Sequence, residues 1–137
     1  MNNLDTVQQT LTFARHAGAD EAEALLSRRR VLTIEVGNGE IETIKQAEDQ
    51  GLALRARVGN RIGLSYATDL SEASLRRAAQ RAVEIARASD ADEFVGFAEP
   101  RALPHIIGFD PEMAQHSTDE KIERAFAIER AARQYDS

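Results

Sequence analysis

The sequence is poor in several residue types on which folds and active sites often depend. Its 137 residues include no cysteine, no tryptophan and three prolines, and aromatic residues make up 5% of the chain. The lack of cysteine excludes disulfides, thiolate metal ligands and a cysteine nucleophile within this sequence, and it suits the reducing cytoplasm in which we expect the protein. Because aromatic residues are scarce, the core must be built mainly from aliphatic side chains.

Long apolar runs and an excess of positive charge are also missing. No segment approaches the roughly 20 apolar residues that cross a bilayer, and the first residues lack the basic and apolar parts of a secretory signal. The net charge is −6, and Lys45 and Lys121 are the only lysines. A nucleic-acid-binding protein normally presents a basic surface. We therefore expect no membrane partner and no direct nucleic-acid partner.

Two helices are predicted in the first ninety residues. Apolar residues at helical spacing predict a helix over residues 3–17, and Gly18 is suited to the left-handed conformation that ends it. Ser71 is a suitable N-cap for the second helix, and Leu70 and Leu75 are placed to form a hydrophobic staple. The buried stripe of this second helix is mostly alanine. We therefore expect its axis to approach a sheet closely.

The region between these helices has the alternating pattern of strands. Turns are predicted at residues 37–39 and 59–60, where glycine and asparagine accept positive φ. The expected strands are 22–26, 31–36, 40–47, 52–58 and 62–66, the first of them weak. Ile62, Leu64 and Tyr66 are expected to extend the apolar face of Leu52 and Leu54, with Gly63 and Ser65 behind them. The predicted fold is α+β: an antiparallel sheet of four to five strands with two helices packed on one face.

The last third of the chain differs in composition. All three prolines lie in residues 90–116, which predicts a connector. Ser117 and Glu120 resemble a capping box before an amphipathic helix over residues 118–134. We expect three parts: an α+β domain over 1–89, a connector containing proline and glycine over 90–116, and a C-terminal helix over 117–137. That helix is expected to lead toward a downstream domain absent from this sequence, because its apolar face would otherwise stay uncovered.

Reactive constellations are scarce. The histidines do not have the spacing of a zinc-binding helix, and the acidic run after residue 89 lacks the spacing of a calcium loop. These residues are His16, His105, His116, Asp90, Asp92 and Glu93. We expect no catalytic residue, no metal ligand and no cofactor in this chain.

A polar second face of the sheet offers the best candidate surface. We expect Arg55, Arg57, Glu35 and Ser65 to lie on it. Solvation accounts for most such faces, but arginine also offers planar, bidentate contacts to carboxylates and peptide groups. Both interpretations remain open, and we name these four residues as candidates for facing a partner or a peptide.

Several sequence segments together resemble the N-terminal region of the TldD/PmbA family. The pattern covers nearly the whole chain, and no single segment identifies the family alone. The matching segments are Gly18–Glu23, Gly39–Glu42, Gly51–Arg55, Tyr66–Ser71 and Ala82–Arg87. The sequence Phe109-Asp110-Pro111 and the segment that leads into Tyr135-Asp136 resemble the PmbA-type subunit slightly more than the TldD-type subunit.

The resemblance implies a cytoplasmic, two-subunit, zinc-dependent peptidase that processes peptides such as microcin precursors and antitoxins. In this family the TldD-type subunit carries a His-Glu-x-x-x-His zinc helix in its later region, and the PmbA-type subunit lacks it. This zinc-binding motif is absent from the present sequence, so no zinc ligand can be carried over to it. We expect this chain to be inactive by itself. The implied role is subunit assembly and substrate enclosure. The implied partners are the remainder of its own chain, a homo- or heterodimer subunit of the same family, and peptide substrate.

Two alternatives come from other functional classes. The family's older label as modulators of DNA gyrase suggests a regulatory interaction module that contacts gyrase or another protein. A domain that senses a small molecule would share the same general topology.

Overall fold

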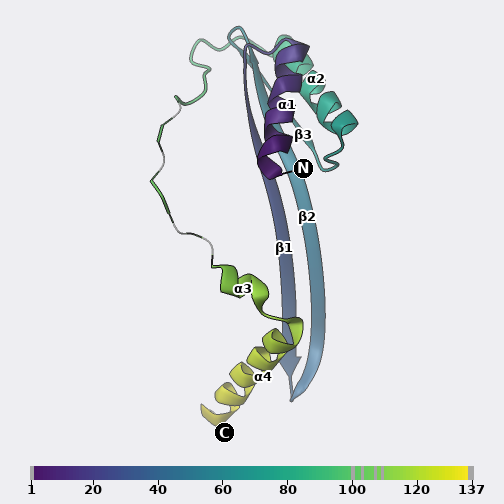
Figure 1. Ribbon diagram of the computed structural model, residues 1–137, viewed down its shortest axis with the longest axis vertical. Coiled ribbons are helices and arrows are strands. Elements are labelled where there is room, and N and C mark those ends of the chain that lie inside the picture. Colours follow the sequence, from purple (N-terminus) through teal and green to yellow (C-terminus); the bar gives the residue numbers. More distant parts are fainter. Residues whose placement is uncertain (1, 100, 103, 107, 109, 136–137) are drawn as a thin grey trace. The chain divides into compact units, whose positions relative to one another are not determined.

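The computed structural model describes residues 2–99, 101–102, 104–106, 108 and 110–135 (Figure 1). Phe109 and Asp136, which contributed to the PmbA-like pattern, lie outside these residues. The described elements are α1 (Asn3–Ala17), β1 (Glu21–Gly37), β2 (Glu40–Val58), β3 (Arg61–Ala67), α2 (Glu72–Ala88), α3 (Pro111–Gln115) and α4 (Thr118–Tyr135). The strands form one antiparallel sheet in the order β1-β2-β3. The predicted α+β class is confirmed. Among the described helices, none combines the length and apolar character needed to cross a bilayer.

The described residues contain three strands, whereas the sequence analysis predicted four or five. Two pairs of expected strands are each continuous: β1 unites 22–26 with 31–36, and β2 unites 40–47 with 52–58. Neither junction contains a turn. Residues 27–30 are a serine and three arginines, and Gly51 keeps a negative φ compatible with a strand. Polar residues at these two junctions change which side chains the strand presents to solvent, but the strand itself continues.

The chain forms two compact units. As far as they are described, the first contains residues 2–29 and 49–99, and the second contains residues 30–48 and 101–135. β1 and β2 each supply residues to both units. The α3 helix falls in the segment predicted to be a connector, and the boundaries predicted after residues 89 and 116 remain a prediction.

In the first unit, α1 and α2 pack side by side on one face of the sheet, as predicted (Figure 1). The largest fully buried side chains are Leu52 and Leu54 of β2, Leu75 and Val83 of α2, and Thr10 of α1. Alanines of α1, β2 and α2 fill the space between them. The core is therefore aliphatic, which agrees with the small aromatic content of the sequence.

The orientation of β3 is opposite to the predicted one. Leu54 pairs with Ser65, and Arg55 pairs with Leu64. Ser65 is therefore buried beneath α2, with 7% of its surface exposed, whereas Leu64 and Tyr66 are 55% and 79% exposed on the other face. The prediction that Ile62, Leu64 and Tyr66 extend the face of Leu54 is wrong.

Two physical reasons explain this orientation. The two-residue turn sets Val58 opposite Arg61, so alternate residues from Gly63 onward face the helices. Only small residues fit there, because α2 approaches β3 closely: a Cβ at Gly63 would overlap the backbone of Ala82 and Ala86. The alternation of large apolar residues in β3 predicted that the opposite face would be buried. The close contact with α2 outweighs this preference.

The predicted helix ends are confirmed. Gly18 has φ +103° and ends α1 in the left-handed region. Ser71 caps α2, since its Oγ accepts a hydrogen bond from the Ser74 amide. At the start of α4, the Ser117 amide donates to Glu120 Oε2, and the Glu120 amide donates to Ser117 Oγ. These reciprocal bonds form the capping box that the sequence predicted.

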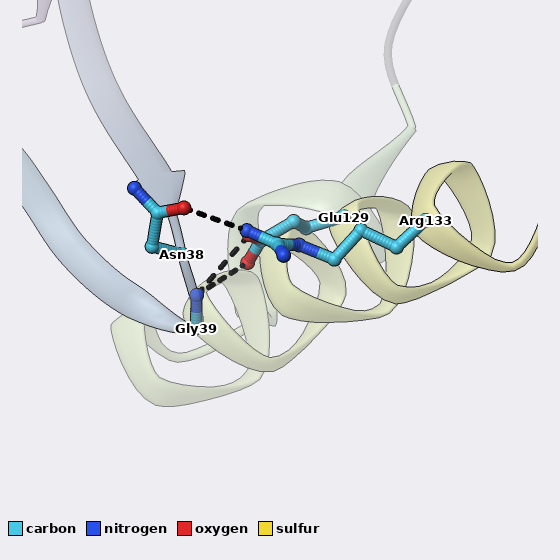
Figure 2. Close-up of polar contacts among 4 residues, drawn as sticks. All are labelled: Asn38, Gly39, Glu129 and Arg133. Carbon is cyan, nitrogen blue, oxygen red and sulfur yellow. Dashed lines mark hydrogen bonds and ion pairs between the residues drawn. The ribbon is translucent and has the colours of Figure 1, made fainter. Parts of the chain in front are cut away.

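In the second unit, α4 contacts the turn between β1 and β2 (Figure 2). Gly39, with φ +75°, donates its amide hydrogen to both carboxylate oxygens of Glu129 at 3.1 and 3.2 Å. Arg133 Nη2 donates to Asn38 Oδ1 at 3.0 Å, and Arg133 Nε also pairs with Glu129. No described residue of α4 is fully buried. The contact is therefore held by these hydrogen bonds and not by a buried apolar core.

Candidate functional site

The candidate surface lies on the face of the first unit's sheet that α1 and α2 leave open. Arg55 and Arg57 of β2 both point to this face, because the intervening Ala56 points into the core. Each arginine meets a glutamate of β1. Arg57 Nε lies 2.9 Å from Glu21 Oε2, and Arg55 Nε lies 2.6 Å from Glu23 Oε1. Residues two apart on one strand therefore pair with residues two apart on the next.

Further hydrogen bonds fix the Arg57 end of this row. Arg57 Nη1 also donates to the carbonyl oxygen of Gly59, and the Gly59 amide donates to Asp20 Oδ2 at 2.6 Å. The hydrogen bond from Arg57 is the main reason that the pKa of the Glu21 carboxyl is lowered. The same bond raises the pKa of Arg57. Both groups are held in their charged forms at neutral pH.

Exposed apolar side chains border the ion pairs. Leu64 lies directly across the β2–β3 ladder from Arg55, and Tyr66 lies across from Ala53. Both side chains are exposed. The guanidinium of Arg55 also lies over the ring of Phe97, 5.1 Å from its centroid. Protein interfaces commonly combine arginine and aromatic anchors with a polar rim, so this face has the composition of a contact surface.

The structure separates the four predicted site residues. Arg55 and Arg57 lie together on the open face. Ser65 lies on the opposite face, where its hydroxyl donates to the Ala78 carbonyl at 2.7 Å, so its expected position beside the arginines is wrong. Glu35 is exposed and belongs to the second unit. For Arg55, Arg57 and Glu35, contact with a partner stays a prediction.

Sequence reasoning missed the partners of the two arginines. The weak strand predicted over residues 22–26 begins one residue after Glu21 and contains Glu23, and the prediction gives neither glutamate a role. A usable signal was present: Glu-x-Glu in one strand and Arg-x-Arg in another have matched period and opposite charge. Leu64 and Tyr66 were missed for a different reason, because they were expected in the core.

A zinc site needs histidine, cysteine or carboxylate side chains that converge on one point. Among the described residues, no three histidine, aspartate or glutamate side chains gather so that they could hold a metal ion. His116 Nδ1 lies 3.4 Å from Glu120 Oε2, but its Nε2 lies 3.0 Å from Arg124 Nη2. A guanidinium at that position repels a cation. The described residues do not fit a zinc site, and no step through zinc is derived for them.

Comparisons with known proteins agree with this architecture. Residues 22–86 match the family described as PmbA/TldA metallopeptidase domain 1. The metalloprotease PmbA of Escherichia coli O157:H7 is 34% identical over 122 residues, which are 86% of this chain and 27% of that protein. A metalloprotease PmbA homolog of Haemophilus influenzae is 28% identical over 136 residues, 95% of this chain and 29% of that protein.

A solved structure shows the same fold. The crystal structure of TldE from Thermococcus kodakarensis superposes with a TM-score of 0.80 at 21% identity, covering 96% of this chain and 30% of that one. This chain therefore spans less than a third of the length of the relatives that it matches.

Proposed function

Because this chain resembles the N-terminal region of the TldD/PmbA metallopeptidase family, we propose that it is a non-catalytic N-terminal domain of a peptidase of this type. In this proposal it serves subunit assembly and encloses peptide substrate. The observation that carries the proposal is the match of residues 22–86 to the first domain of that family.

The share of the relatives that is covered supports a non-catalytic role. The chain covers 27% of the Escherichia coli metalloprotease PmbA, so most of that protein has no counterpart here. The sequence contains no His-Glu-x-x-x-His helix, and the described histidines do not gather with carboxylates into a metal site. In the proposed peptidase, catalytic groups are supplied by polypeptide other than this chain.

The open face of the sheet supports an assembly role. It combines two ion pairs, Glu21–Arg57 and Glu23–Arg55, with the exposed side chains of Leu64 and Tyr66. Exposed apolar side chains beside paired charges are suited to burial against another polypeptide. The partner in this proposal is another part of the full-length peptidase or a second subunit.

Two experiments test the proposal. The first incubates the chain with an unfolded peptide and zinc, and follows the products by mass spectrometry. No cleavage is expected, and reproducible zinc-dependent hydrolysis would refute the non-catalytic role.

The second experiment tests assembly. In Escherichia coli PmbA, this chain replaces the corresponding N-terminal segment, and the chimera is co-expressed with a tagged TldD-type subunit. Co-purification is expected, and the Leu64→Ser, Tyr66→Ser double variant should reduce it at least several-fold. Leu4→Ser is the matched control, because Leu4 is exposed on α1, the helix that packs on the other face of the sheet. Equal capture of the double variant and the control would contradict the proposed surface.

A further inference from the structure

The second edge of β3 has no strand beside it among the described residues. In the sheet order β1-β2-β3, β3 pairs only with β2. The two-residue turn makes Val58 and Arg61 a hydrogen-bonded pair, and such pairs alternate along an antiparallel ladder. The backbone groups of Gly63 and Ser65 therefore point to β2. Those of Leu64 and Tyr66 point outward and remain available to another strand.

A groove runs along this free edge. It has a volume of about 640 Å³, and its residues come from two elements. Residues 64–69 form one side. One stripe of α2 forms the other side, with the spacing expected of a single helical face: Ser74, Arg77, Ala78, Arg81 and Ile85. A strand edge facing one stripe of a helix is the arrangement in which several domains receive an extended peptide as an added strand.

The helix side of the groove is positively charged. Arg77 and Arg81 both line it, and within the described residues neither forms an ion pair with a carboxylate. Asp69 is the one acidic residue that lines the groove. Its two carboxylate oxygens accept hydrogen bonds from the Ser71 amide and the Ser71 hydroxyl. These bonds lower the pKa of Asp69, with a smaller contribution from the charge of Arg77.

We propose that this groove binds an extended acidic segment of another polypeptide, which adds to β3 as a fourth strand. Its backbone would pair with the outward groups of Leu64 and Tyr66. Two acidic side chains separated by one residue would face Arg77 and Arg81.

The spacing of the arginines supports an acidic-x-acidic pattern. Residues four apart in a helix are separated by about 6 Å along its axis. Residues two apart in a strand are separated by roughly 6.6 Å. Alternate side chains of an added strand therefore match one turn of α2. The inference goes beyond the proposed function and does not depend on it, since the groove lies within a single unit of this chain.

Peptide binding to the full chain tests the proposal. The probe is a fluorescein-labelled peptide, Thr-Glu-Val-Glu-Thr, measured by fluorescence anisotropy. Saturable binding is expected, and the Arg77→Gln, Arg81→Gln double variant should weaken it at least tenfold. Arg28→Gln, Arg29→Gln is the matched control: it removes the same charge from β1, at the opposite edge of the sheet, and should change binding less than twofold.

Two further peptides separate strand addition from simple charge attraction. A peptide with lysine in place of both glutamates should not bind. A peptide N-methylated at alternate residues keeps both carboxylates but loses backbone donors, and it should bind at least tenfold more weakly.

Several results would overturn the proposal. These are no saturable binding, equal weakening by the two double variants, full binding of the N-methylated peptide, and binding of the lysine peptide. A concentration-dependent dimer that is abolished by Tyr66→Pro would also overturn it, because it would assign this edge to a second copy of the chain.

Discussion

Gly63 of β3 lies directly against the backbone of Ala82 in α2, with no space for a side chain between them. A Cβ built at Gly63 would overlap the Ala82 carbonyl oxygen, and backbone atoms are much less able to move aside than the end of a flexible side chain. This contact fixes which face of β3 is covered by the helix. The groove beside β3 depends on the same contact, because α2 forms its other side.

Gly63→Ala should destabilise the fold. We expect the free energy of unfolding to fall by about 1–3 kcal/mol, because an added methyl group forces strand and helix apart. Urea denaturation followed by circular dichroism measures the change. Gly96→Ala is the matched control, since a Cβ there meets nothing within 4 Å and should change stability little. Equal stability of the two variants would show that α2 does not approach β3 this closely.

Two leucines on opposite faces of the sheet should respond differently to truncation. Leu54 is fully buried, so Leu54→Ala should cost about 2–5 kcal/mol of unfolding free energy. Leu64 is mostly exposed, and Leu64→Ala should stay within about 0.5 kcal/mol of the parent protein. Chemical denaturation of both variants tests the register of β3. A larger loss at Leu64 would restore the orientation first predicted from its apolar pattern.

The contact between α4 and the β1–β2 turn should depend on pH. The Gly39 amide is the main reason that the pKa of the Glu129 carboxyl is lowered, with Arg133 adding to the effect (Figure 2). A lowered pKa means that the folded state favours the carboxylate. The contact is therefore complete above the ordinary pKa of a glutamate, and it is lost as the pH falls through the lowered value.

The Gly39 amide chemical shift, followed by NMR, reports this transition. Its midpoint should lie below the ordinary pKa of glutamate. Glu129→Gln should remove the transition, whereas Glu123→Gln, a matched change at an exposed position of α4, should preserve it. A Gly39 shift that titrates identically in both variants would contradict the contact.

The two ion pairs on the open face should be separable by titration. Arg57→Gln should raise the pKa of Glu21 toward its ordinary value, because it removes the hydrogen bond that chiefly lowers it. Arg55→Gln is the control, because Arg55 pairs with Glu23. Carboxyl carbon NMR of Glu21 measures both. An unchanged Glu21 pKa in Arg57→Gln would mean that the pair does not form in solution.

Features determined by a few neighbouring residues were predicted well. The cap at Ser71, the end of α1 at Gly18 and the capping box before α4 each depend on residues within one helical turn. The alanine stripe of α2 also correctly predicted a close approach to the sheet. Such local signals are visible in a sequence because both partners lie within the same short segment.

The candidate surface could be predicted only in part. Arg55 and Arg57 were recognised, but Ser65 was placed on the wrong face, and Glu21 and Glu23 were given no role. The length of β1 and β2 was also missed, because a change from apolar to polar residues resembles the end of a strand. The contact between Arg57 and Glu21 joins residues 36 positions apart, and the patterns of the individual strands do not fix such a pairing.

By itself the sequence determined the helix ends, the tight turn at residues 59–60, an aliphatic core and the resemblance to a peptidase family. Only the tertiary structure decided which face of β3 is buried. Two demands conflict there: the large apolar side chains of Leu64 and Tyr66 favour burial, but the turn and the approach of α2 admit only Gly63 and Ser65. Close backbone packing prevailed over side-chain hydrophobicity, and it left Leu64 and Tyr66 exposed on the other face of the sheet.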